Sequence, residues 1–177
     1  MSEIVIRYIE RERASDINIK NEPFKLFGRM LPCYQDGRWS FTTVENEKIG
    51  WDIFPDENYD YEKMKQDHIF IGAYDGSACI GLAILQKQWH KYIYLYDLKV
   101  NRSYRGGHIA TKMIDTACAY AKEQGYRGVW TIGQDNNLAA CLFYVKNGFR
   151  IGGLDTNIYI GTSQEGKADI YFYKDAK

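Results

Sequence analysis

Arg105, Gly106 and Gly107 stand together in the run NRSYRGGHIAT, immediately before a segment with helical spacing. The first turn of a helix presents unpaired N–H groups and the positive end of the helix dipole. Two glycines would let a phosphate approach these groups, and the Arg105 guanidinium could add a charge-assisted hydrogen bond. A glycine pair before a helix is also typical of a tight turn. The run therefore indicates either a phosphate-binding helix start or a plain turn.

A second segment with chemical potential runs from residue 45 to residue 62, where acidic side chains alternate with aromatic rings. Its carboxylates are Glu45, Glu47, Asp52, Asp56, Glu57, Asp60 and Glu62, against Lys48 alone, and its rings are Trp51, Phe54, Tyr59 and Tyr61. Carboxylates attract an aminated molecule and aromatic faces add cation–π contacts, so the segment suits a cationic ligand. Charge runs are also commonly solvated surface, and we expect only one or two of these residues to touch a ligand.

The secondary-structure elements that must position these residues can be read from the spacing of apolar residues, which changes along the chain from a strand pattern to a helical one. We expect strands over 3–10, 68–74, 78–88 and 92–100, with Asp75 and Gly76 as a hairpin turn. After residue 100 the apolar spacing becomes helical, and with the stop at Gly125 it predicts an amphipathic helix over 109–124. A strand over 128–133, a helix over 137–147 and two last strands, FRIGGL and ADIYFY, follow.

The N-terminal third is less regular. Residues 16–31 around Pro23 predict a short, broken helical region, residues 38–54 an extended segment or a hairpin, and residues 60–67 a short helix. The whole order predicts an α/β fold of the α+β type, with a mixed sheet covered by helices. The strand over 92–100 should cross over through its helix to a parallel neighbour at 128–133.

Length and composition narrow the class of protein. With 177 residues, 45% of them hydrophobic, the chain can bury one sizeable core, so we expect a single domain over 1–177. Lysine plus arginine and aspartate plus glutamate both number 23, which favours neither nucleic acid nor a membrane surface as partner. The sequence has no apolar run near the roughly 20 residues that span a bilayer, and no signal-peptide pattern. Four separated cysteines, Cys33, Cys79, Cys118 and Cys141, predict no metal site and fit a reducing cytoplasm.

Two motifs carry a specific resemblance. The run LKVNRSYRGGHIATKMI resembles the coenzyme-binding segment of the GNAT superfamily of N-acetyltransferases, in which a strand leads into Arg-Gly-x-Gly-x-Gly/Ala and a helix. Matches to the superfamily pattern Asn-x-x-Ala-x-x-Phe-Tyr-x-x-x-Gly-Phe are Asn137, Ala140, Phe143, Tyr144, Gly148 and Phe149. The run QDNNLAACLFYVKNGFRIGGLDTNIY is more closely similar to the streptothricin acetyltransferases, a resistance group of the superfamily. The likeness, over about residues 68–175, implies a mostly antiparallel sheet of about seven strands, splayed in the middle for coenzyme A.

The resemblance implies that acetyl coenzyme A is the co-substrate and that motifs within 92–149 bind it. Its pyrophosphate would lie on the N–H groups of residues 105–111, and its pantetheine arm would run beside the preceding strand as an added strand. The coenzyme-binding residues implied are Leu98, Lys99, Val100, Arg105, Gly106, Gly107, His108, Ile109, Ala110, Thr111, Asn137 and Tyr144. His108 replaces the second glycine of the pattern, and its imidazole either touches the phosphates or faces solvent.

Acetyl transfer needs a neutral amine, an N–H group for the oxyanion and a proton donor for the leaving thiolate. The resemblance assigns the donor role to Tyr144, which could otherwise pack its helix against the sheet, and a backbone N–H near Leu98 suits the oxyanion. Asp97 lies where several amine-acetylating relatives carry a carboxylate. We therefore expect Asp97 either to contact the acceptor amine as general base or to bind an element from the opposite face of the sheet.

The acceptor-binding segment is expected within 25–65, with Trp51 and Asp52 as contacts. Asp135 and Asp155 follow strands near the presumed site, and each either meets a substrate amine or forms a local turn. The resemblance favours a primary amine of a cationic small molecule, above all the β-lysine amine of streptothricin, and hence antibiotic resistance. A polyamine, another aminoglycoside-like drug and a protein N-terminus are alternative acceptors, and a non-catalytic acyl-coenzyme sensor is an alternative role. Both a monomer and a homodimer are compatible with the sequence.

Overall fold

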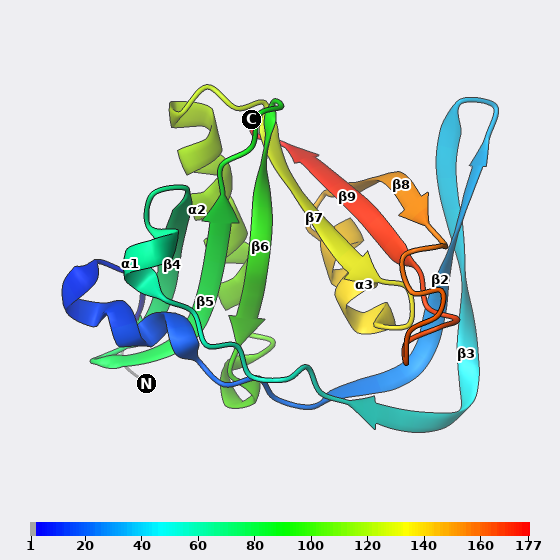
Figure 1. Cartoon of the computed structure of the whole chain (residues 1–177), viewed down its shortest axis with the longest axis horizontal. Coiled ribbons are helices and arrows are strands. Elements are labelled where there is room, and N and C mark those ends of the chain that lie inside the picture. Colours follow the sequence, from blue (N-terminus) through cyan, green and yellow to red (C-terminus); the bar gives the residue numbers. More distant parts are fainter. Residues whose placement is uncertain (1–2) are drawn as a thin grey trace. The chain divides into compact units, whose positions relative to one another are not determined.

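The computed structural model describes residues 3–177 and has two sheets (Figure 1). The strands are β1 (Ile4–Tyr8), β2 (Phe24–Gln35), β3 (Arg38–Asp52), β4 (His68–Asp75), β5 (Ala78–Gln86), β6 (Tyr92–Val100), β7 (Gly128–Gln134), β8 (Arg150–Asp155) and β9 (Asp169–Asp175). The helices are α1 (Tyr61–Met64), α2 (Ile109–Glu123) and α3 (Leu138–Lys146), with 3-10 turns η1 (Arg11–Asn18) and η2 (Arg102–Tyr104). Seven strands form one sheet in the order β1-β4-β5-β6-β7-β9-β8, and β2 pairs with β3 separately. The predicted seven-stranded, mostly antiparallel sheet flanked by helices is confirmed.

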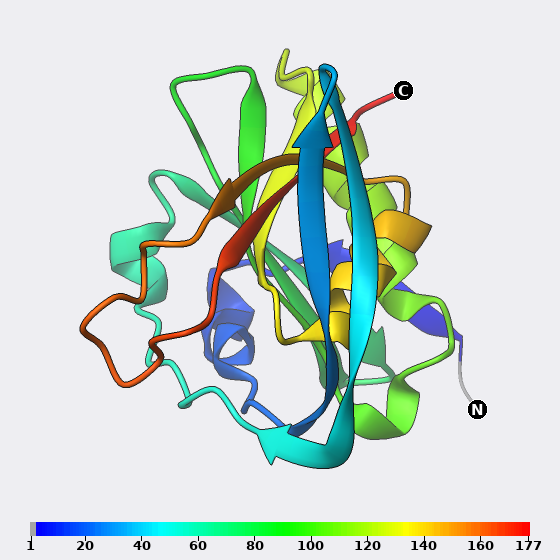
Figure 2. The same cartoon turned by 90° about the vertical axis from the view of Figure 1, so that its right-hand side faces the viewer.

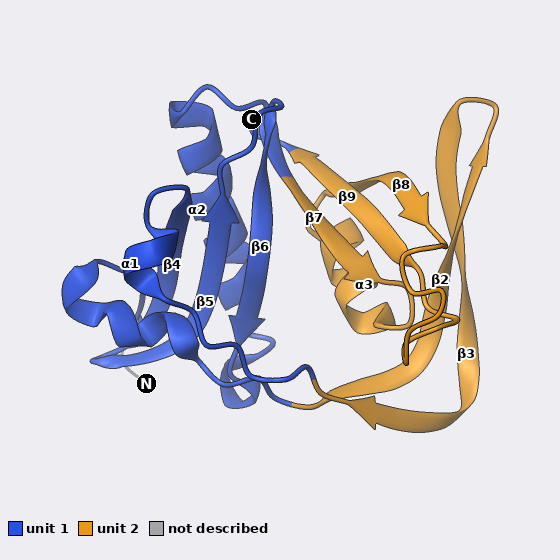
Figure 3. Cartoon of the chain, in the orientation of Figure 1, with its two compact units in different colours: residues 1–22, 54–129, 175–177 blue, residues 23–53, 130–174 orange. Residues whose placement is uncertain are grey.

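The chain divides into two compact units, coloured separately in Figure 3. Unit 1 holds the chain up to Glu22 together with Phe54–Val129 and Asp175–Lys177. Unit 2 holds Pro23–Ile53 and Trp130–Lys174. The coenzyme motif at the start of α2 therefore lies in unit 1, and α3 with Tyr144 lies in unit 2.

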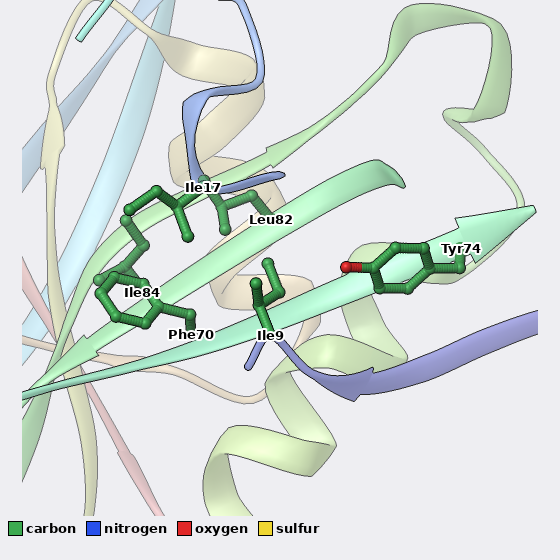
Figure 4. Packing of buried hydrophobic residues seen from close by; sticks show 6 residues of the cluster. All are labelled: Ile9, Ile17, Phe70, Tyr74, Leu82 and Ile84. Atoms are coloured by element: carbon green, nitrogen blue, oxygen red, sulfur yellow. The ribbon is translucent and has the colours of Figure 1, made fainter. Parts of the chain in front are cut away.

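The sheet of unit 1 follows the predicted hairpins closely. Asp75 pairs with Ala78 at the end of the β4–β5 hairpin, and Gly76 has a positive φ of 59°, so the predicted hairpin is confirmed. Its two turn residues are Gly76 and Ser77, one position later than predicted. Helix α2 covers one face of β4, β5 and β6, while η1 and α1 lie on the other face (Figure 1). A buried cluster fills the space under η1 and α1, formed by Ile9, Ile17, Phe70, Tyr74, Leu82 and Ile84 (Figure 4). Burying these apolar side chains is what fixes η1 on the sheet.

The prediction of a broken helix over residues 16–31 is wrong. Residues 11–18 form a 3-10 turn, and residues 24–35 form β2, the first strand of a long hairpin with β3 (Figure 2). Asp36 and Gly37 join the two strands with φ values of 52° and 75°, which is the backbone that a two-residue hairpin turn of the right twist requires. The Asp-Gly pair was the overlooked signal, and tertiary pairing overrides the helical reading of the residues before it.

Helix α3 packs closely on this hairpin within unit 2. A Cβ atom at Gly28 would lie 2.6 Å from the carbonyl oxygen of Val44 and 2.7 Å from Leu138 Cδ2. Only glycine therefore permits this approach of α3 to β2. Asn137, at the N-cap of α3, accepts a hydrogen bond from the Ala140 N–H at 3.3 Å, which starts the helix directly after β7. The hairpin thus fixes the helix that carries Tyr144.

Candidate active site

The loop between β6 and α2 places bare backbone at the start of a 15-residue helix. Gly106 has a φ of 84°, and a methyl group built on it would meet no atom within 4 Å, so this stretch of backbone faces open space. The N–H groups of the first turn of any helix lack partners within the helix. The side chain of His108, at the N-cap, makes no capping hydrogen bond. The start of α2 therefore has the geometry of an anion-binding site.

His108 adopts the left-handed conformation, with φ 57° and ψ 15°. Glycine is the usual residue for such a backbone, and histidine is one of the side chains that tolerates it. The departure from the glycine pattern therefore leaves the turn intact. Contact between the imidazole and a phosphate stays a prediction.

Arg105 is held beside the same loop. Its Nε donates to the carbonyl oxygen of Val100 at 2.9 Å, and its Nη2 lies 3.4 Å from Glu22 Oε2. Glu22 Oε2 also accepts the backbone N–H of Arg102 at 2.6 Å. The Arg105 side chain is 44% exposed, so it keeps a solvent-facing surface while the loop orients it.

Strand β6 brings the other sequence-predicted residues of unit 1 to the loop. Pairing with β5 is regular from Gly81 and Val100 to Ile84 and Asp97, and then shifts so that Leu85 pairs with Leu95. This irregularity leaves Tyr96 as an extra residue, and bulges of this kind re-aim the side chains beside them. Asp97 and Lys99, two residues apart, share the face that η1 covers, whereas Leu98 and Val100 point to the opposite face.

Asp97 and Lys99 form the centre of a polar cluster within unit 1. Lys99 Nζ lies 3.0 Å from Asp97 Oδ2 and 2.8 Å from Glu57 Oε2. The hydroxyl of Tyr59 donates to the same Asp97 oxygen at 3.2 Å. Side-chain exposure is 15% for Asp97 and 11% for Lys99, so this is a largely buried arrangement of two carboxylates and one ammonium.

The cluster changes the acidity of its members. Burial raises the pKa of Asp97 above its ordinary value, and the charge of Glu57 adds to this, while Lys99 acts in the opposite sense. Burial also opposes ionisation of Glu57, but hydrogen bonds from Lys99 and Asn21 outweigh it and lower the Glu57 pKa. Burial and the charge of Asp97 raise the pKa of Tyr59, so its hydroxyl remains a proton-bearing donor to Asp97.

Sequence reasoning selected Asp97 but did not select Glu57, Tyr59 or Asn21 as site residues. Glu57 and Tyr59 lie in the acidic and aromatic segment 45–62, whose composition indicated a cation-binding role without identifying the contacting residues. The interaction with Asn21 is not readable from sequence, because it joins segments far apart in the chain. Its Nδ2 donates to Glu57 Oε2 at 2.9 Å, and its Oδ1 accepts from Lys99 at 3.2 Å.

Tyr144 lies on α3 in unit 2 and is partly buried among aromatic rings. Its ring centroid is 5.4 Å from that of Phe149 and 5.3 Å from that of Phe172. Edge and tilted contacts of this kind fix the ring plane and therefore the direction of its hydroxyl. Its catalytic role, like the contact of Asn137 with the coenzyme, stays a prediction.

Asp135 and Asp155 both have partners inside unit 2. Asp135 is buried, accepts the Ala168 N–H at 2.9 Å on Oδ1 and pairs with Arg29 at 3.3 Å through Oδ2. Asp155 Oδ1 accepts the N–H groups of Asn157 and Ile158 at 2.8 and 3.0 Å. The bonds of Asp155 match the alternative of a local turn, whereas Asp135 joins segments far apart in the chain and is not a local turn residue. A substrate contact by either stays a prediction.

Trp51 and Asp52 end strand β3 of unit 2. The Trp51 residue is 51% exposed, and Lys25 Nζ lies 5.7 Å from its ring centroid. Asp52 Oδ1 accepts the Ile53 N–H at 2.9 Å, and its Oδ2 pairs with Lys167 at 3.3 Å. The exposed indole keeps a surface that a cation could stack on, as its expected acceptor contact would need.

Within residues 3–177, no group of three or more histidine, cysteine, aspartate or glutamate side chains is placed to hold a metal ion. Over the same residues, none of the helices has both the length and the apolar character needed to cross a membrane.

Comparisons with known proteins connect this geometry to acetyl transfer. Residues 32–149 match the acetyltransferase (GNAT) family. The chain is 31% identical over 160 residues to Streptothricin acetyltransferase A of Bacillus subtilis (strain 168), covering 89% of this chain and 92% of that protein. It superimposes with a TM-score of 0.87 and 28% identity, over 99% of both chains, on a candidate streptothricin acetyltransferase of Bacillus anthracis (strain Ames) solved in complex with acetyl coenzyme A. A nourseothricin acetyltransferase structure has the same fold, with a TM-score of 0.80 and 21% identity over 98% of this chain and 99% of that chain.

Proposed function

We propose, from the premise that this chain belongs to the acetyltransferase (GNAT) family, that it moves the acetyl group of acetyl coenzyme A to a primary amine of streptothricin. The acceptor within streptothricin is its β-lysine amine, and the modification gives resistance to the antibiotic. The observation that carries the proposal is the 31% identity to Streptothricin acetyltransferase A, which extends over 92% of that protein.

The start of α2 fits the diphosphate of acetyl coenzyme A. Open space over Gly106 and the first-turn N–H groups of α2 supply a small, positively polarised seat. Arg105 adds a cation whose orientation is set by Val100 and Glu22. The coenzyme supplies the activated acetyl group as a thioester, and the chain's own residues orient it and handle the protons.

The proton relay is assigned to two side chains. Asp97 accepts a proton from the acceptor ammonium, directly or through water, and burial raises its pKa toward the range in which a carboxylate is an effective base. The freed amine attacks the thioester carbon, and the C–N bond forms as the C–S bond breaks. Tyr144 gives its hydroxyl proton to the departing thiolate and recovers a proton from the nitrogen, which loses its second proton as the amide forms. The products are therefore an amide and the coenzyme thiol, with the first proton of the ammonium on Asp97.

The cluster around Asp97 also supports a cationic acceptor. Two carboxylates, Asp97 and Glu57, face one ammonium, Lys99, so the ionised cluster keeps one net negative charge. A cationic amine is attracted to such a site, whereas an anionic or neutral acceptor gains nothing from it. This supports an aminated antibiotic and explains why the acidic segment contributes Glu57.

The test is release of free thiol from acetyl coenzyme A, with streptothricin and spermidine as parallel acceptors. We expect release with streptothricin and little with spermidine. Tyr144→Phe should lower kcat by about a hundredfold or more, because it removes the proton donor and leaves the ring in place. Binding of acetyl coenzyme A by this variant should stay native. Release with spermidine alone would contradict the assigned acceptor, and an unchanged kcat in Tyr144→Phe would contradict the donor assignment.

A further inference from the structure

The two carboxylate oxygens of Asp97 differ in their hydrogen-bond partners. Oδ2 receives the Lys99 ammonium at 3.0 Å and the Tyr59 hydroxyl at 3.2 Å. Among the residues that the structure describes, none donates a hydrogen bond to Oδ1. The Asp97 side chain is 15% exposed. One oxygen is therefore anchored and the other is available to a ligand.

The anchor is itself held by an extensive network. Lys99 Nζ donates to Glu57 and Asn21 as well as to Asp97, and lies 3.4 Å from the carbonyl oxygen of Ile19. A lysine ammonium has three hydrogens, so these partners use its full donor capacity. The Lys99 ammonium is consequently held in place as a structural charge. We assign it no part as the reacting amine or the reacting base.

The segment that supplies Tyr59 and Glu57 is tied to the end of η1. The Tyr59 N–H donates to Asn18 Oδ1 at 2.7 Å, and Asn18 Nδ2 donates to the carbonyl oxygen of Tyr59 at 2.9 Å. The Asn21 N–H donates to Asp56 Oδ1 at 2.7 Å. One reciprocal pair of hydrogen bonds and one single bond therefore hold residues 56–59 over β6, where the side chains of Glu57 and Tyr59 meet Asp97 and Lys99.

We propose that Lys99 is a positioning residue for Asp97, acting with Glu57 and Tyr59: its ammonium holds Oδ2 so that Oδ1 is presented to the acceptor amine. This inference deepens the proposed function and rests on acetyl transfer to an amine. It gives the Lys99 side chain a role separate from the coenzyme contact expected of its backbone. It also makes Glu57 a modulator, because Glu57 competes with Asp97 for the same ammonium.

The competition predicts two variants with opposite effects. The titratable and charged groups facing Asp97 are Lys99 on its own strand and Glu57 and Tyr59 on the covering segment, with Asp56 behind Asn21. Removing Lys99 removes the larger of the two influences that lower the pKa of Asp97, the other being the hydrogen bond from Tyr59, so the Asp97 pKa rises. Removing the charge of Glu57 takes away a like charge and leaves Asp97 as the one charged partner of Lys99 in the cluster, so the Asp97 pKa falls.

The experiment is a carboxyl carbon-13 NMR titration of Asp97 in the full chain, without acceptor or coenzyme, with the signal assigned by Asp97→Asn. We expect the midpoint to move to higher pH in Lys99→Met and to lower pH in Glu57→Gln. Lys63→Met is the matched control, because the Lys63 side chain is 84% exposed. The Asp97 midpoint in this variant should stay native. Unchanged midpoints, or a shift in the same direction in both cluster variants, would overturn the proposal.

Kinetics supply the second readout. Lys99→Met should lower kcat by about tenfold or more while the KM for acetyl coenzyme A stays native, and Lys99→Arg, which retains the cation, should recover part of the loss. If Lys99→Met fails to fold, Glu57→Gln and Lys99→Arg still give the titration result. The titration contains no acceptor, so it tests the role of Lys99 independently of streptothricin. If the Asp97 midpoint moves in the two expected directions but streptothricin is not acetylated, only the proposed acceptor is contradicted.

Discussion

At the scale of single residues, His108 shows how a departure from a motif can be tolerated. The family pattern has glycine at this position, and the φ of 57° explains why. Histidine can adopt this conformation, so the N–H groups of the α2 start keep their orientation. The sequence predicted this tolerance, since it depends on backbone preference alone, but it did not predict the contacts of Arg105 with Val100 and Glu22.

His108→Gly tests which part of the residue matters. We expect native affinity for acetyl coenzyme A, because the backbone N–H groups form the phosphate seat. His108→Ile should lose about 1–2 kcal/mol of unfolding free energy, since a β-branched side chain is strained at positive φ. Calorimetric titration with acetyl coenzyme A and urea unfolding measure the two quantities. A large loss of affinity for acetyl coenzyme A in His108→Gly would instead show that the imidazole contacts a phosphate.

At the scale of elements, strands β4, β5 and β6 and helices α2 and α3 were predictable, because each has a clear hydrophobic period and a turn or cap at its end. Strand β2 was not, because its pairing with β3 depends on a partner outside any local window. The Asp36–Gly37 turn was the available signal. Pattern reading therefore succeeded where local preference and tertiary packing agree, and failed where packing alone decides.

Asp135 offers a test of element packing. Its backbone carbonyl accepts the Met30 N–H at 2.9 Å, and its carboxylate pairs with Arg29, so it joins the end of β7 to the β2–β3 hairpin. Asp135→Asn keeps an acceptor for the Ala168 N–H but removes the charge opposite Arg29. Because Arg29 is 40% exposed, we expect a loss of about 1–3 kcal/mol in unfolding free energy, below the range for a fully buried pair.

The same variant separates packing from substrate binding. If Asp135 acts only through the fold, the KM for streptothricin in Asp135→Asn should match that of the native protein at a temperature where both are folded. Thermal unfolding gives the stability, and thiol-release kinetics give the KM. A raised KM without loss of stability would move Asp135 into the acceptor site.

At the scale of the whole molecule, equal numbers of basic and acidic residues exclude a strong overall field, so charge recognition must be local. The cluster around Asp97 is such a local site. It brings together three charged side chains, Asp97, Glu57 and Lys99, from two segments of unit 1. Sequence reasoning found the coenzyme motif and Asp97 because both rest on short patterns. It could not find the Lys99 network, since that network depends on how residues 18–21 and 56–59 fold over β6.

Identification of the reaction product tests the central claim most directly. Purified protein, acetyl coenzyme A and streptothricin should yield one monoacetylated product, with the acetyl group placed on the β-lysine amine by tandem mass spectrometry and NMR. Asp97→Asn and Tyr144→Phe should each give far less of the same product in the same time. Acetylation at a different functional group, or unmodified streptothricin despite tight coenzyme binding, would contradict the account.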